Sequence, residues 1–424
     1  MRSLLLIAYC RPVNDLERPK DTSPPVLSRG FVVLLATAIG VIAANLYYAQ
    51  PLVAMISQAL GLSPGAAGLV VTLTQAGYGL GVLLVVPLGD IVENRRLVMT
   101  MIAVTICGLL GLAFAKQLAP YFLAAFATGI GASTVQVLVP YAAHFAPEEK
   151  RGAIVGSLMS GLMLGIMLSR PTASLLTDLF GWHAVFVLSA VLMSIVGVVL
   201  FTKLPPRAPS NAGLTYSRLL ASMARLFART PILRRRSIYQ ALLFGAFCLF
   251  WTASPLYLSG PDFHFSQTSI AIFALVGVAG AVSAPFAGKA ADRGKSQLAT
   301  AIAMIGSSIS FLLSHLFIQG STASLLALVA GAILLDAGTT ANLVLGQRAI
   351  FALEASIRGR LNGLYIATIF VGGAAGSALG AWSYAHGGWW LTSWVGFALP
   401  LSALLFFTTE RLYVSKGPPL ASAR

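Results

Sequence analysis

Charged side chains are scarce in this sequence. Asp, Glu, Lys and Arg make up 10% of the 424 residues, whereas 57% are hydrophobic, and the mean hydropathy is +0.83. A soluble globular domain has about 25% charged residues, so that class is excluded. A helix that crosses a bilayer needs about 20 mostly apolar residues. Runs of this kind recur along the chain between short polar breaks, so the sequence predicts an all-α membrane protein.

Cysteine and the common catalytic motifs are also scarce or absent. Cys10, Cys107 and Cys248 are far apart in the sequence, which indicates neither a disulfide framework nor a metal site. HExxH, paired cysteines and GxSxG do not occur. The stretch "GKAADRGKS" resembles a phosphate-binding loop, but its Gly288-to-Gly294 spacing is one residue too long and it follows an apolar helix. We therefore expect no metal and no cofactor, and a membrane enzyme is the weakest alternative.

Acidic residues are few: 13, against 28 Lys and Arg, which gives a net charge of +15. The basic residues gather at alternate breaks between apolar runs, and the intervening breaks contain only Lys116. By the positive-inside rule, this pattern places both termini and the central loop in the cytoplasm of a multi-pass inner-membrane protein. A basic surface that faces an anionic inner leaflet explains the charge without nucleic acid as a partner. The N-terminal "MRSLLLIAYC" has Tyr9 where cleavage needs a small residue, so we expect a tail rather than a signal peptide.

Twelve apolar runs are long enough to be transmembrane helices. They cover residues 31–57, 66–88, 96–115, 120–143, 151–176, 182–202, 237–258, 268–290, 297–318, 322–346, 358–381 and 388–408.

The chain resembles itself at an offset of roughly 205 residues, as an internal duplication would. "AQPLV" from Ala49 matches "ASPLY" from Ala253, and "FGWHAVF" around Trp182 matches "GGWWLTS" around Trp389. We therefore expect two pseudo-symmetric six-helix bundles. The predicted organisation is an N-terminal tail at 1–29, bundles at 30–203 and 237–410, a basic cytoplasmic linker at 204–236 and a C-terminal tail at 411–424.

The linker contains a second pattern. Leu219, Met223 and Leu226 fall on one face of a helix, and Arg218, Arg225 and Arg229 fall on the other. This pattern predicts either a helix that lies in the inner-leaflet interface or a solvated linker helix.

Several motifs stand out along the chain: "ANLYYAQPLV", "PLGDIVENRRLV", "GIMLSRP", and "LLDAG" followed by "NLVLGQR". Together with the helix count and the basic central loop, they resemble the major facilitator superfamily over about residues 30 to 410. They look like those of a bacterial branch that is similar to the twelve-helix drug:proton antiporters. The resemblance implies secondary transport by alternating access. The antiporter-like pattern of helix 151–176 is only partly present, because Ile166 replaces the expected proline.

The family's loop after the second helix occurs twice in degenerate form. The first copy keeps Asp90 but has Val86 in place of the leading glycine and Ile91 in place of the arginine, and the second is one residue short before Gly294. Asp90 is expected to contact the start of helix 358–381, and Asp292 the start of helix 151–176, because free N–H groups at helix N-termini attract carboxylates. Alternatively, these charges only determine the orientation of the chain in the membrane and the turn between the helices. The predicted cytoplasmic gating residues are Asp90, Arg95, Arg96, Arg151, Gly288, Asp292, Arg293 and Arg358.

Glycines occur within the four predicted helices that form the seam between the bundles in this family. They are expected to let those helices approach closely. They are Gly77, Gly79, Gly81, Gly156, Gly161, Gly165, Gly277, Gly280, Gly372, Gly373, Gly376 and Gly380.

Asp336 and Arg170 are the two charges well inside apolar runs. A charge at the bilayer centre costs roughly 2.5 to 3.5 kcal/mol on insertion scales and is a functional candidate by default. Asp336, about 21 Å along its helix, is the candidate proton-coupling residue, because a desolvated carboxylate favours its protonated form; the alternative is a permanent structural pair. Arg170, about 28 Å along its helix, is expected close to the outer face. It binds an anionic substrate there, closes an outer gate with Asp178, or is an interfacial anchor.

Polar and aromatic residues are expected to line the substrate cavity together with Arg170, although membrane-interface aromatic belts explain some of the tyrosines equally well. They are Asn45, Tyr47, Tyr48, Gln50, Gln75, Tyr78, Gln136, Trp251, Thr252 and Asn342. Such a cavity suits neutral or cationic amphiphiles better than polyanions.

These patterns together predict a monomeric secondary transporter that exports a small organic molecule or drug against proton entry. A sugar or metabolite carrier of the same fold, working by symport or facilitated diffusion, is the first alternative. A transporter-like sensor or inert scaffold is a further one.

Overall fold

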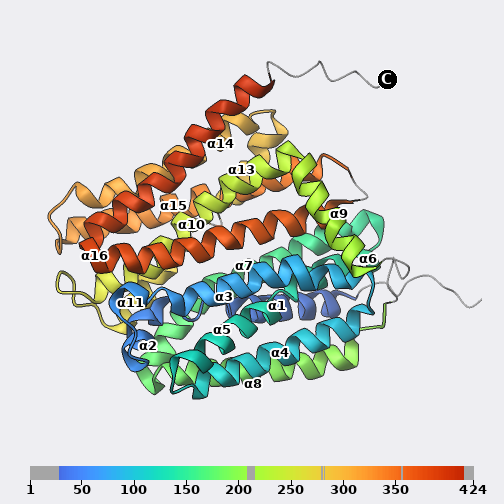
Figure 1. The fold of residues 1–424 in the computed structure, drawn as a ribbon, viewed down its shortest axis with the longest axis horizontal. Helices are drawn as coiled ribbons and strands as arrows, with labels where there is room; N and C mark the ends of the chain where they lie inside the picture. Colours follow the sequence, from blue (N-terminus) through green and yellow to red (C-terminus); the bar gives the residue numbers. More distant parts are fainter. Residues whose placement is uncertain (1–27, 208–214, 278–279, 281, 355–356, 415–424) are drawn as a thin grey trace, which may run out of the picture.

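The regular elements of the structure are all helices in the part of the chain that it describes (Figure 1). The structure is a computed structural model and describes residues 28–207, 215–277, 280, 282–354 and 357–414. Nine of the described helices are long and apolar enough to cross a membrane, and two shorter apolar helices accompany them. The chain is therefore built as a multi-pass membrane protein.

The elements that precede the linker form a first group. They are α1 (Arg29–Ala44), η1 (Gln50–Leu52), α2 (Val53–Ala59), η2 (Pro64–Ala66), α3 (Leu69–Leu80), η3 (Gly81–Val85), η4 (Val86–Asp90), α4 (Asn94–Phe114), α5 (Leu118–Ala132), α6 (Val135–Phe145), α7 (Glu148–Phe180) and α8 (Trp182–Lys203).

The linker helix and a second group follow. These elements are α9 (Tyr216–Arg229), α10 (Pro231–Ser259), α11 (Gln267–Ala274), η5 (Leu275–Gly277), α13 (Ser283–Asp292), α14 (Ser296–Leu312), η6 (Leu313–His315), α15 (Thr322–Phe351) and α16 (Arg358–Val414).

The two groups lie on opposite sides of the molecule, the first in the lower part of Figure 1 and the second in the upper part. They meet where α3 packs on α16 and where α11 packs on α7. Within α16 the backbone leaves helical geometry at Gly387 and Gly388, which has a φ of +57°. The helix therefore continues as two arms (Figure 1). We call the end of the bundle that carries α9 the linker end, and the end that carries α2 and α11 the far end.

Several predicted helices differ from the observed ones. The helix expected at 31–57 is interrupted after Ala44, where the Asn45 side chain donates to the carbonyl groups of Val41 and Ile42, at 3.0 and 3.1 Å, and Pro51 follows in η1. The helix expected at 268–290 is divided by η5. α10 begins at Pro231 rather than at 237, inside the predicted linker, and α16 continues past 410 into the predicted C-terminal tail. The rest of both predicted tails lies outside the described residues.

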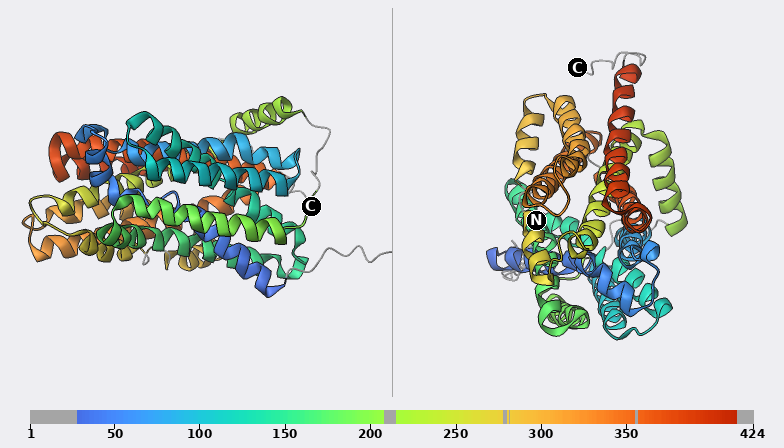
Figure 2. Two further views of the ribbon diagram at one scale, coloured as in Figure 1. Left: turned by 90° about the horizontal axis from the view of Figure 1, so that it is seen from below. Right: turned by 90° about the vertical axis from the view of Figure 1, so that its left-hand side faces the viewer.

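The apolar face of α9 packs against the bundle. Leu219 and Met223 are buried, and the Tyr216 hydroxyl donates to the Leu84 carbonyl at 2.6 Å. The arginines of the opposite face are exposed. Figure 2 shows α9 on the outside of the bundle. The helix therefore fastens the linker to the bundle, and its guanidinium groups remain free to face solvent or lipid phosphate.

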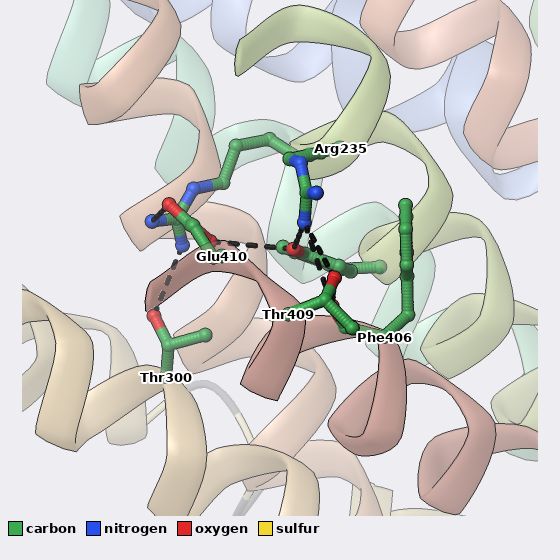
Figure 3. Close-up of polar contacts among 7 residues, drawn as sticks. Arg235, Thr300, Phe406, Thr409 and Glu410 are labelled. Carbon is green, nitrogen blue, oxygen red and sulfur yellow. Dashed lines mark hydrogen bonds and ion pairs between the residues drawn. The ribbon is translucent and has the colours of Figure 1, made fainter. Parts of the chain in front are cut away.

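A buried polar cluster joins three helices at the linker end (Figure 3). Arg236 is 8% exposed, forms an ion pair of 3.2 Å with Glu410 and donates to the Thr300 hydroxyl at 3.2 Å. Arg235 donates to the Thr409 hydroxyl at 3.0 Å. A buried charge needs partners of this kind because desolvation is costly. These arginines, which the sequence places in the linker, in fact tie the start of α10 to α14 and to the end of α16.

Most of the glycines predicted for the seam pack inside their own group. A Cβ at Gly161 would lie 2.2 Å from the Ala36 carbonyl oxygen in α1, and one at Gly376 would lie 2.0 Å from the Gly245 oxygen in α10. Gly79 does face across the seam, where a Cβ would lie 3.3 Å from the Phe370 Cβ in α16. The glycines thus allow close helix packing, but mainly within each group.

Candidate functional site

A cavity of about 150 Å³ lies between the two groups. Its wall is mostly apolar and aromatic, with a small number of polar side chains, the usual make-up of a small-molecule site. Its lining residues are Ala43, Leu46, Tyr47, Tyr78, Gln136, Leu162, Met163, Ile166, Met167, Arg170, Gln240, Phe244, Phe247, Gly277, Asp336, Thr339, Thr340, Leu343, Ile366, Ile369 and Phe370.

Asp336 lies on the cavity wall in α15 and is only 4% exposed. Its Oδ1 accepts a hydrogen bond of 3.0 Å from the Trp251 indole N–H in α10. Two glycines, Gly277 and Gly280, face it. A Cβ at Gly277 would lie 3.0 Å from Asp336 Oδ2, and a Cβ at Gly280 would lie 2.4 Å from the Asp336 Cβ. The carboxylate is therefore held by one donor on one side and by bare backbone on the other.

Arg170 of α7 reaches the same place from the first group. It is 3% exposed, and its Nε donates to Gln50 Oε1 at 2.8 Å. Its guanidinium carbon lies 4.4, 5.1 and 5.3 Å from the ring centroids of Trp251, Phe247 and Tyr47. Such contacts stabilise a cation away from water.

The position of Arg170 corrects the prediction that it lies close to the outer face. Its Nη1 lies 3.4 Å from the place that a Gly277 Cβ would take, next to Asp336. The prediction was wrong because α7 continues to Phe180 instead of ending at 176. Arg170 is thus about 15 Å from the far end of its helix, and Asp336 about 21 Å from the far end of α15, at 1.5 Å per residue. A long side chain easily spans the difference, so the interfacial-anchor reading is wrong.

The two opposite charges are neighbours but not an ion pair, since none of the ion pairs of 4.0 Å or less among the described residues joins them. Arg170 Nη2 is buried and has no hydrogen-bond partner among the described residues. Buried donors are normally satisfied, so an unsatisfied one on a cavity wall needs an explanation.

The remaining residues predicted to line the cavity divide into two sets. Tyr47, Tyr78 and Gln136 do line it, and Gln50 and Trp251 contact its two charges. The others lie behind the wall and serve packing or helix–helix contacts. These are Asn45, Tyr48, Gln75, Thr252 and Asn342. Asn45, for example, accepts a hydrogen bond from Ser189, and Asn342 donates to Gln240 Oε1 at 2.7 Å.

A chain of amide side chains separates this cavity from a second one at the linker end. Gln136 donates to the Tyr78 hydroxyl at 3.0 Å and accepts from Asn362 Nδ2 at 3.4 Å, and Asn362 accepts from Gln347 at 3.3 Å. The Tyr78 and Phe370 ring centroids are 4.1 Å apart. The second cavity has about 360 Å³ and shares Gln136 with the first. The contact between Gln136 and Asn362 therefore joins the two groups at the boundary between the cavities.

Of the predicted gating charges, Asp90 lines the second cavity. Asp90 is 3.9 Å from Arg360 in the first turn of α16, close to the expected contact. Asp292 forms an ion pair with Arg348 of α15, not with the start of α7, which corrects that prediction. The Asp292 pair therefore holds α13 to α15 inside the second group and does not close a gate.

The other predicted gating residues contact residues of their own group or are exposed. The side chains of Arg95, Arg151 and Arg358 donate to the carbonyl groups of Phe201, Ala143 and Phe351, respectively. Arg96 lies 4.0 Å from Glu93, Arg293 is exposed, and a Cβ at Gly288 would meet nothing within 4 Å.

Sequence reasoning missed Gln240, Thr339, Thr340, Arg360 and Asn362, which line one of the two cavities. Gln240 lies near the predicted start of its helix, where polar residues are common, so no pattern distinguishes it. Among the described residues, no group of three or more His, Cys, Asp or Glu is arranged to hold a metal ion.

Comparison with known proteins identifies the family. The sequence pattern of the Major Facilitator Superfamily matches residues 35–318 and 262–422. The uncharacterized transporter YgaY of Escherichia coli O157:H7 is 39% identical over 363 residues, 86% of this chain and 91% of that protein. The probable transporter SCO4007 of Streptomyces coelicolor is 32% identical over 365 residues, 85% of this chain and 83% of that protein.

Two solved structures share the fold. A mutant of the nucleoside transporter NupG has a TM-score of 0.70 at 12% identity, over 89% of this chain and 99% of that one. A POT family transporter in complex with 5-aminolevulinic acid has a TM-score of 0.70 at 14% identity, over 93% of this chain and 99% of that one. The chain therefore belongs to the Major Facilitator Superfamily and is a membrane transporter of a small molecule, not an enzyme.

Proposed function

We propose that this protein is a secondary transporter that moves a small organic molecule by alternating access and couples the movement to protons through Asp336. The observation that carries the proposal is the buried carboxylate on the wall of the central cavity, with a single hydrogen bond from Trp251. A carboxylate that meets a desolvated cavity in one state and water in another can take up and release a proton.

The proposal includes twelve membrane crossings in two six-helix bundles, at 30–203 and 237–410. The nine long spans, α1 with α2, α11 with α13, and the division of α16 at Gly387 support this count. It also includes an inner-membrane location with the linker end in the cytoplasm, as the arginine distribution favours.

The coupling could take one of two forms, antiport with protons or symport with protons, and a different observation favours each form. The resemblance to drug:proton antiporters favours export against proton entry. The guanidinium of Arg170 beside Asp336 favours carriage of a metabolite together with a proton, because a cation bound at Asp336 would meet a positive neighbour.

The test is proton movement in proteoliposomes under an imposed pH gradient. Wild type and Asp336→Asn are compared while organic anions, cations and neutral sugars are supplied in turn. We expect a substrate-dependent proton flux in the wild type that Asp336→Asn abolishes.

Asp262→Asn is the matched control, because this carboxylate is exposed at the far end, outside the cavity. It should keep the wild-type flux. Equal flux in wild type and Asp336→Asn would refute the coupling role, and solute movement without protons would indicate facilitated diffusion.

A further inference from the structure

We propose that Arg170 is the anion-binding point of the substrate site, and that the transported molecule is a small organic monoanion, such as a carboxylate on an apolar or aromatic body. The inference rests on the proposed function, because it names the substrate class of the same cavity.

The first argument is the unused hydrogen-bonding capacity of the guanidinium. Its Nε is fixed on Gln50, whereas Nη2 is buried without a partner in the described part of the chain. Arginine presents its donors in a planar fork that matches a carboxylate. Because one side of this fork is already held in place, a carboxylate in the cavity finds an oriented donor and does not have to order a mobile side chain.

The second argument is the shape and polarity of the surroundings. Tyr47, Phe247 and Trp251 surround the guanidinium at 4.4 to 5.3 Å, and Phe244, Met163 and Met167 continue the cavity wall. A cavity of about 150 Å³ with a mainly apolar wall suits a compact molecule with one polar group. It offers no second cation for a polyanion, since Arg170 is the only Lys or Arg among its lining residues.

The third argument is the charge balance, which links the anion to the proton. Asp336 faces Arg170 across Gly277. The other ionisable side chains that interact with Arg170 are Tyr47 and Cys248, both of types that are neutral at pH 7. With Asp336 ionised, the site is electrically neutral and a bound anion would add one uncompensated negative charge. With Asp336 protonated, the anion restores neutrality, so proton and anion favour each other's binding.

The experiment measures equilibrium binding to the purified full-length protein in nanodiscs, using tryptophan fluorescence and radioligand competition. The probes are matched pairs of equal shape: benzoate with benzamide, phenylacetate with phenylacetamide, and benzylamine as the cation. We expect at least one carboxylate to bind at least tenfold more tightly than its amide. Its affinity should rise as the pH falls, by up to about tenfold per pH unit while Asp336 is mainly ionised.

Variants test the assigned residues. Arg170→Gln should weaken carboxylate binding at least tenfold and leave amide binding unchanged, and Arg170→Lys should restore part of the preference. Asp336→Asn should keep the carboxylate preference but lose its pH dependence. Arg229→Gln, which changes an exposed arginine of α9 outside the cavity, is the control and should bind as wild type.

The outcomes separate this inference from the proposed function. If no carboxylate binds better than its amide, or if Arg170→Gln binds as wild type does, the anion site is refuted. An Asp336-dependent proton flux with a cation or a neutral sugar would then leave the coupled transporter standing. Carboxylate binding that depends on Arg170, without any proton flux, would uphold the site and refute the coupling.

Discussion

At the scale of single residues, the notable feature is that two buried charges of opposite sign lie side by side and yet use other partners. Arg170 donates to Gln50 and Asp336 accepts from Trp251. Leaving a buried charge without a partner is costly. Gln50 therefore stabilises Arg170, and Trp251 stabilises Asp336, even though the two charges do not form an ion pair with each other. This arrangement leaves Arg170 Nη2 and Asp336 Oδ2 available to a ligand or a proton.

Gly280 makes this arrangement possible, and replacing it tests the packing. A Cβ there would lie 2.4 Å from the Asp336 Cβ and 2.9 Å from its backbone carbon, so Gly280→Ala must displace α15. We expect a loss of about 1 to 3 kcal/mol in stability, seen as a lower unfolding temperature in detergent, and a loss of proton-coupled flux. Gly288→Ala, where a Cβ meets nothing within 4 Å, is the control. Equal unfolding temperatures for the two variants would contradict the proposed packing.

At the scale of elements, the start of α4 shows how a loop charge orders two helices. Glu93 is the N-cap of α4 and accepts from the backbone N–H groups of Arg95 and Arg96 at 2.7 and 3.0 Å. It also accepts from the N–H of Arg207, after α8, at 3.2 Å. Partial burial by itself would raise the pKa of Glu93, but these hydrogen bonds hold it below its ordinary value. The residue thus joins the beginning of α4 to the segment that leaves the first group.

A carboxylate with a lowered pKa in the folded state stabilises the protein above its unfolded pKa, about 4.3 for Glu. That contribution disappears as the pH falls through the folded value. Glu93→Gln should therefore cost about 1 kcal/mol at pH 7. The difference from wild type should shrink towards zero below about pH 4. Thermal unfolding in detergent at several pH values measures it, with Asp262→Asn as an exposed-carboxylate control; a difference that is constant with pH would show that the charge is not involved.

At the scale of the whole molecule, contacts between the two groups occur at both ends. At the far end, the Thr72 hydroxyl donates to the Ala374 carbonyl at 3.1 Å, and Thr268 donates to Asp178. At the linker end, Gln136 and Asn362 meet at 3.4 Å. Alternating access requires that contacts of one end break while those of the other persist.

A reversible cross-link tests this requirement. In a variant with Cys10, Cys107 and Cys248 replaced, Gln136→Cys with Asn362→Cys joins the two groups through a short bifunctional thiol reagent. We expect transport to fall to background and to return when a cleavable reagent is reduced.

The control links neighbours within the second group, Gln347→Cys with Asn362→Cys, whose native side chains are 3.3 Å apart. Transport should persist there, because the two helices move together. Unimpaired transport with the first pair cross-linked would contradict a moving seam at this point.

The sequence by itself determined the class of the protein and the identity of the two charges beside its central cavity. Bilayer physics imposes long apolar helices and makes intramembrane charges rare, so hydropathy reveals the spans, and Asp336 and Arg170 stand out as residues. Only the tertiary structure decided where these charges meet. The number of residues from the start of a helix gives the approximate depth of a side chain in the bilayer, but it does not show toward which neighbouring helix the side chain points. Helices of unequal length also begin at different depths, which shifts that estimate. The same limit explains why Asp292 pairs within its own group and why α9 rests on protein: partner choice depends on packing between segments far apart in the chain, which no local pattern records.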